Sequence, residues 1–139
     1  MEDHSQHFSG NVAQKAIIER DGKMLVCRGV GDTVWELPGG RLHDGEKPVD
    51  GIVREIKEEF GVIVTNVRPF RVERNYHFRS KCYQVFIVYR CVYDGSPMTV
   101  DDSEIEEMKW VTPDELRVLP MFDDGGTKEV VSAYLDEIV

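Results

Sequence analysis

Cysteine is scarce in this sequence, and the few cysteines present form no recognisable pattern. Cys27, Cys82 and Cys91 are odd in number and contain no Cys-x-x-Cys pair, the spacing typical of zinc sites. All three lie within apolar segments, which favours buried, reduced thiols. The sequence therefore argues against a fold held together by disulfide bonds or structural zinc.

Long apolar runs are also missing, and none approaches the ~18 residues needed to cross a bilayer. The N-terminus is polar and acidic, unlike a signal or transit peptide, so we expect a cytoplasmic protein. Internal repeats, low-complexity stretches and Pro/Gly/Ser-rich linkers are absent as well. We therefore expect residues 1–139 to form a single domain, with 1–9, including His4 and His7, as a loose tail.

Positive charge is in deficit. Seventeen Lys and Arg face 26 Asp and Glu, a net charge of −9. A nucleic-acid polymer needs a basic surface, so we expect no such partner. A small phosphate-bearing molecule can still bind if divalent cations reverse the local sign of charge.

Five segments have the patterns of β-strands. Residues 13–19 and 23–28 flank an Asp21-Gly22 turn, a hairpin signal. Residues 35–38 predict a short strand that stops before Gly39-Gly40, a pair that permits backbone geometry closed to other residues. Residues 81–93 are apolar on both alternating faces, as in a central strand covered on both sides, and residues 108–111 predict a further short strand.

Three segments have helical patterns. Residues 48–60 begin with Pro48 and stop before Gly61, and their apolar stripe consists of Val49, Ile52, Val53, Ile56 and Phe60. Thr112 opens a short helix with a capping-box pattern. Residues 127–139 predict an amphipathic helix whose apolar stripe is Val130, Val131, Tyr134, Leu135 and Ile138. Mixed strands and helices of this kind favour an α/β/α sandwich with a mixed sheet.

An acidic cluster stands beside the apolar stripe of the helix at 48–60. Glu55, Glu58 and Glu59 share one helical face, and Gly51 lies one turn earlier. A solvated acidic face is the ordinary explanation. However, like charges at this spacing repel by ~0.2–0.5 kcal/mol per pair, and the helix dipole disfavours anions near this end. A divalent cation would offset both effects, and Gly51 predicts a close approach to this face.

Residues 40–62 read Gly-x5-Glu-x7-Arg-Glu-Ile-x-Glu-Glu-x-Gly-Val and resemble the Nudix box at every defined position. The segments 35–40 and 108–116 resemble the flanks common in that family, and the similarity to MutT-like members covers residues 10–139. The resemblance implies the Nudix α/β/α sandwich, which agrees with the interpretation of the strand and helix patterns.

The resemblance also implies roles for the residues of the box. Glu55, Glu58 and Glu59, with the carbonyl oxygen of Gly39, would bind Mg²⁺ or Mn²⁺. Either Glu55 or Glu59 would activate the attacking water, a choice that the family leaves open. Arg54 would hold the carboxylates in place by ion pairs. Glu46 would support the loop, and Arg41 would face the diphosphate.

Outside the box the candidates are less defined. Many members take one more acidic ligand before the last strand; Glu104, Glu106 and Glu107 compete for this role, and the spacing favours Glu104. Arg28, Tyr76 and Phe78 are candidate substrate contacts, through phosphate pairing or base stacking. Trp35, Phe70, Arg74 and Arg79 are further possibilities, although core packing explains the first two better.

The expected function is metal-dependent hydrolysis of a diphosphate bond in a nucleoside diphosphate derivative, with a small-molecule nucleotide as substrate and no membrane partner. A MutT-like nucleoside triphosphate pyrophosphohydrolase stands slightly ahead of an ADP-ribose or dinucleotide pyrophosphatase. The alternative is a non-hydrolytic Nudix domain that senses a nucleotide or binds a partner protein. A prenyl diphosphate isomerase fits less well, because no suitable cysteine is apparent. Homodimers are common among the relatives that the resemblance suggests.

Overall fold

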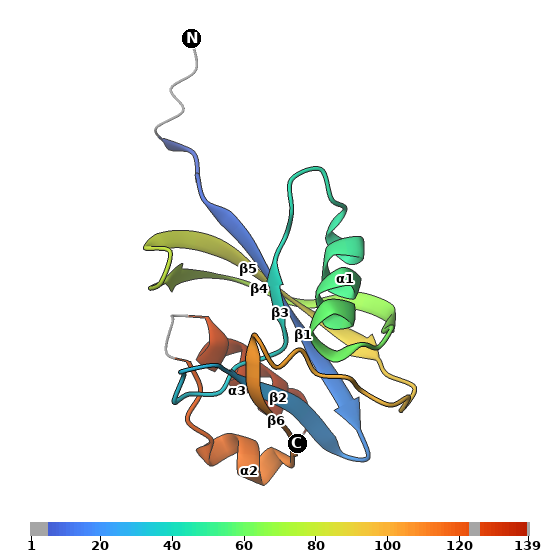
Figure 1. Cartoon of the computed structure of the whole chain (residues 1–139). Helices are drawn as coiled ribbons and strands as arrows, with labels where there is room; N and C mark the ends of the chain where they lie inside the picture. The colour runs from blue at the N-terminus through green and yellow to red at the C-terminus, as the bar shows by residue number, and fades with distance from the viewer. Residues whose placement is uncertain (1–5, 123–125, 139) are drawn as a thin grey trace.

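The computed structural model describes residues 6–122 and 126–138, and these residues form a mixed six-stranded sheet between helices (Figure 1). The elements in chain order are β1 (Asn11–Arg20), β2 (Lys23–Gly29), β3 (Gly39–Arg41), α1 (Pro48–Phe60), β4 (Thr65–His77), β5 (Cys82–Val92), β6 (Ile105–Val111), α2 (Pro113–Val118) and α3 (Thr127–Glu137). The prediction of a loose tail at residues 1–9 falls partly outside the described residues, because residues 1–5, which include His4, are not described. Residues 6–9 are exposed.

The sheet is organised around β1. Its strands lie in the order β4-β5-β1-β2-β6, and β3 pairs with β1 off this path. The β1–β5 pair is parallel, whereas the remaining pairs are antiparallel. The predicted hairpin is confirmed, with Asp21 and Gly22 both at positive φ. β5 is an interior strand, as its two apolar faces predict, but β1 occupies the centre.

Each face of the sheet carries its own apolar core, and α1 lies on the opposite face from α2 and α3 (Figure 1). Ile52, Ile56 and Phe60 of α1 pack on one face and are fully buried. On the other face α3 packs through the residues Val130, Val131, Tyr134 and Leu135. The expected α/β/α sandwich is therefore confirmed.

Helix α1 begins and ends where its sequence predicts. Pro48 occupies the first helical position, and Gly61 follows the helix with φ 70°, a left-handed conformation that suits glycine. A Cβ at Gly51 would lie 2.5 Å from Gln14 Oε1, so the predicted close approach is real and comes from the protein itself. Val49, assigned to the apolar stripe, is 47% exposed instead.

Two strand predictions need correction. Residues 35–38 do not form a regular strand: Trp35 and Glu36 each make a single bridge, and the strand β3 starts at Gly39. β4 was not predicted at all. Its 13 residues are mostly polar and include Pro69. Among the described strands it pairs only with β5, so as an edge strand it can leave much of its surface in water.

The C-terminal helices largely match their patterns. Thr112 and Glu115 form the predicted capping box. Ile138, assigned to the stripe of α3, follows the helix and is exposed, and the predicted end at residue 139 lies outside the described residues. Cys27 and Cys91 are buried free thiols, whereas Cys82 is only partly buried. In the part of the chain that is described, every helix is too short or too polar to span a bilayer.

Candidate active site

The acidic face of α1 meets the short strand β3. Glu55 and Glu59 are only 9% and 6% exposed, while the side chain of Glu58 is exposed. Glu59 Oε1 accepts a hydrogen bond of 2.9 Å from the backbone N–H of Gly39. A Cβ at Gly40 would lie 2.5 Å from Glu55 Oε2. The Gly39-Gly40 pair therefore brings the backbone against two carboxylates, and Gly39 has a φ of 141° that other residues rarely adopt.

Arg54 connects the carboxylates of the box. Its guanidinium donates to Glu46 at 2.6 and 3.0 Å, to Glu55 at 3.0 Å and to Glu58 at 3.1 Å. It also donates to the carbonyl oxygen of Arg41 at 3.1 Å. The hydrogen bonds from Arg54 lower the pKa of Glu46 to about 2. Arg54 thus holds three acidic side chains and the backbone after β3 in one network.

The carboxylates nearest β3 carry more negative charge than their surroundings stabilise. Burial raises the pKa of Glu59 to about 8, although Lys15 and the Gly39 N–H act in the opposite direction. Burial also raises the pKa of Glu55, against the opposing effect of Arg54. Desolvated carboxylates of this kind are typical of sites that bind cations.

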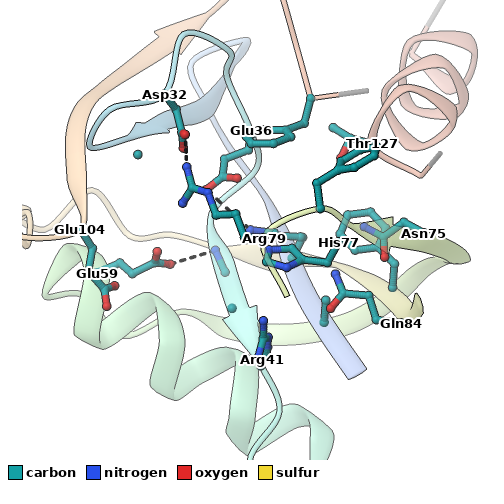
Figure 2. Close-up of a pocket in the computed structure, with 18 of the residues that line it drawn as sticks. Asp32, Glu36, Arg41, Glu59, Asn75, His77, Arg79, Gln84, Glu104 and Thr127 are labelled. Atoms are coloured by element: carbon teal, nitrogen blue, oxygen red, sulfur yellow. Dashed lines mark hydrogen bonds and ion pairs between the residues drawn. The ribbon is translucent and has the colours of Figure 1, made fainter. Parts of the chain in front are cut away.

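A cleft of about 520 Å³ opens beside this cluster. Figure 2 shows Glu59 and Glu104 on one side of the cleft, Arg41 between, and Asn75, Gln84 and Thr127 on the other side. Tyr76 and Phe78 also line it and meet edge to face, with ring centroids 5.2 Å apart. The cleft is therefore acidic at one end, and amide and aromatic side chains occupy the other.

The structure brings most of the candidate residues together. Seven of them line the cleft, namely Gly39, Arg41, Glu59, Tyr76, Phe78, Arg79 and Glu104. Glu55, Glu58 and Arg54 do not line it but belong to the adjoining network of Arg54.

Arg28 is the exception, since it neither lines the cleft nor belongs to the network of Arg54. It pairs with Glu106 at 2.5 Å and with Glu107 at 3.1 Å. These ion pairs also engage two of the three acids that competed for the extra ligand position, and leave Glu104 as the one at the cleft. Trp35 lies in the core and Phe70 packs against it, as core packing predicts.

Sequence reasoning did not single out several residues of the cleft. Lys15 comes from β1 and lies 3.9 Å from Glu36. Burial lowers its pKa, but Glu36, Glu59 and Glu55 outweigh that effect and raise the pKa above its ordinary value. A lysine within the apolar run of β1 was the available signal. Asp32, from the loop after β2, forms an ion pair with Arg79 of the β4–β5 turn (Figure 2).

The donor set fits a hard divalent cation, because it consists of carboxylates and a backbone carbonyl. Within residues 6–122 and 126–138, however, no three acidic, histidine or cysteine side chains converge on one point. The contacts explain this: Arg54 holds Glu55 and Glu58, and Gly39 holds Glu59.

Comparison with known proteins decides the family. A family model described as the NUDIX domain matches residues 11–134, a range that includes the box and every residue that lines the cleft. The chain belongs to the Nudix family. It is a Nudix hydrolase, and the sequence-based expectation of family, fold and enzyme class is confirmed.

The Nudix relatives are similar across most of their length. Nucleoside triphosphatase NudI of Escherichia fergusonii is 28% identical over 114 residues, which is 72% of this chain and 80% of the relative. The crystal structure of a MutT Nudix hydrolase from Burkholderia pseudomallei aligns with a TM-score of 0.77 at 24% identity, over 88% of this chain and 95% of that one. The Nudix domain of Shewanella oneidensis NrtR, complexed with ADP ribose, aligns with a TM-score of 0.75 at 14% identity, over 99% and 94%. These structural similarities establish the fold alone.

Proposed function

We propose that this Nudix hydrolase cleaves a nucleoside triphosphate, in the presence of a divalent cation, to a nucleoside monophosphate and pyrophosphate. The observation that carries the proposal is the intact set of box glutamates at the acidic end of a cleft large enough for a nucleotide. The similarity to nucleoside triphosphatase NudI supports this substrate class over ADP-ribose and dinucleotides.

The residues that would hold Mg²⁺ or Mn²⁺ are Glu55, Glu58, Glu59 and Glu104, with the carbonyl oxygen of Gly39. A bound cation of this type neutralises phosphate charge, lowers the pKa of a coordinated water and stabilises the leaving phosphate. Glu104 joins the set because it lines the cleft with Glu59, whereas Glu106 and Glu107 pair with Arg28.

The side chains around the acidic end of the cleft position the carboxylates, activate the water and bind the phosphates. Arg54 holds Glu55 and Glu58 in place through charge-assisted hydrogen bonds. Glu55 or Glu59 orients the attacking water and accepts its proton. Lys15 and Arg41, the two basic residues lining the cleft near these glutamates, face the phosphates. Water then attacks one phosphorus, and the P–O–P bond to the departing group breaks.

A substrate panel with Mg²⁺ tests the proposal. We expect turnover of one or more nucleoside triphosphates, measured as phosphate released after coupling to inorganic pyrophosphatase, and loss of turnover when EDTA replaces Mg²⁺. ADP-ribose, diadenosine polyphosphates and sugar nucleotides, coupled to alkaline phosphatase, complete the panel. Turnover confined to those compounds would refute the triphosphate assignment. If a folded protein hydrolyses none of the compounds in the panel, a non-hydrolytic nucleotide-binding role would be favoured.

A further inference from the structure

The end of the cleft away from the glutamates contains a buried amide. Gln84 lies on β5 opposite Asn75 of β4 and shares a face with Phe86, and its side chain is among those that line the cleft. Gln84 is only 3% exposed. Its Oε1 atom has no hydrogen-bond partner in the described part of the chain.

An unpaired buried amide oxygen destabilises a folded protein, and native structures contain few of them. Position 84 falls in a strand whose neighbours on the same face, Phe86 and Val88, belong to the apolar core. An apolar side chain would therefore suit this position better for folding alone. The residue instead lines the cleft (Figure 2), so a ligand bound there can supply the missing donor once the side chain turns toward it.

We propose that Gln84 is a specificity-determining residue whose amide oxygen accepts a hydrogen bond from an N–H group on the edge of the substrate's base. This inference rests on the proposed function. With the phosphates at Glu59 and Glu104, the nucleoside extends toward the opposite side of the cleft, where Gln84 lies (Figure 2). Phe78 also lines the cleft, is exposed and offers aromatic surface to a base.

A second buried glutamine provides a matched control. Gln14 lies on β1 but on the face covered by α1, and it does not line the cleft. Its Nε2 atom donates to the carbonyl oxygen of Pro48 at 2.7 Å and to the hydroxyl of Tyr89 at 3.0 Å. Its Oε1 atom, like that of Gln84, has no hydrogen-bond partner among the described residues, but Gln14 does not line the cleft. Gln14 therefore joins β1 to α1, and its loss should weaken the fold without changing which base is accepted.

The test compares wild type, Gln84→Met and Gln14→Met on pairs of nucleoside triphosphates that differ in one N–H donor. The pairs are ATP with its analogue lacking the 6-amino group, CTP with its analogue lacking the 4-amino group, and UTP with 3-methyl-UTP. In at least one pair we expect wild type to prefer the donor-bearing member by about tenfold in kcat/KM. The ratio should fall to near one in Gln84→Met and persist in Gln14→Met.

Melting temperatures separate recognition from a structural role. Gln84→Met should melt no lower than wild type, because it removes an unpaired polar atom, whereas Gln14→Met should melt lower. A wild-type enzyme that hydrolyses triphosphates without preference within any pair would overturn the inference and leave the proposed function intact. So would a preference that persists in Gln84→Met. No hydrolysis of any triphosphate by wild type would overturn both.

Discussion

Replacing Glu59 by glutamine is expected to lower Mg²⁺-dependent kcat by roughly 10²–10⁴-fold, the range for losing a general base or an essential metal ligand. Glu59 is the box glutamate that lines the cleft. Glutamine keeps the shape of the side chain and can still accept the hydrogen bond from Gly39. It removes the negative charge, and with it the capacity to bind a cation strongly or to accept a proton. Initial rates at saturating substrate and Mg²⁺ measure the effect.

The melting temperature of Glu59→Gln and the activity of a control variant, Glu106→Gln, complete this experiment. Since burial disfavours the charged form of Glu59, the Glu59→Gln protein should melt no lower than wild type in EDTA. Glu106→Gln is the matched control, because Glu106 pairs with Arg28 away from the cleft, and it should keep wild-type turnover. Full activity in Glu59→Gln, or an equal loss in Glu106→Gln, would remove the basis for the proposed catalytic centre.

The substitution Arg54→Met should also have a large effect, and we expect it to reduce both the stability and the activity of the protein. The substitution leaves Glu46, Glu55 and Glu58 without the guanidinium that pairs with all three. Removing one partner of a fully buried ion pair costs about 3–5 kcal/mol. Because Arg54 is partly exposed and solvent screens the remaining charges, we expect a loss of about 2 kcal/mol in the free energy of unfolding. Urea unfolding in EDTA measures it.

The same variant gives a test that depends on the cation. Mg²⁺ can compensate part of the lost positive charge, so it should raise the melting temperature of Arg54→Met more than that of wild type. Arg28→Met is the control, since Arg28 also joins two carboxylates, Glu106 and Glu107. There we expect a smaller loss of stability than in Arg54→Met, because solvent screens the exposed ion pairs of Arg28, and no added response to Mg²⁺. An equal response in the two variants would contradict a cation site beside Arg54.

The helix bearing the chemistry could be predicted closely because its signals are local. Pro48, Gly61 and a periodic apolar stripe set the limits of α1, and the spacing of its glutamates places them on one face. The edge strand β4 had no such signal. It is polar, and its pairing with β5 is what orders it, so the decisive contact lies outside its own sequence.

In the cleft, too, some residues could be predicted from local sequence signals and others could not. The glutamates of the box are recognisable from their spacing, whereas Lys15 and Gln84 come from two different strands that only the sheet brings together. Glu104, Glu106 and Glu107 competed for one proposed ligand position; of the three only Glu104 lines the cleft, and Arg28 pairs with the other two. Long-range packing of this kind cannot be inferred from residue types alone.

The most direct test of the account is to identify the products of the preferred nucleoside triphosphate, hydrolysed with Mg²⁺ in ¹⁸O-labelled water and followed by ³¹P NMR and mass spectrometry. The account predicts a nucleoside monophosphate and pyrophosphate in equal amounts, with one ¹⁸O atom incorporated into one of the two. A nucleoside diphosphate with orthophosphate as products, or hydrolysis that continues at full rate in EDTA, would contradict it.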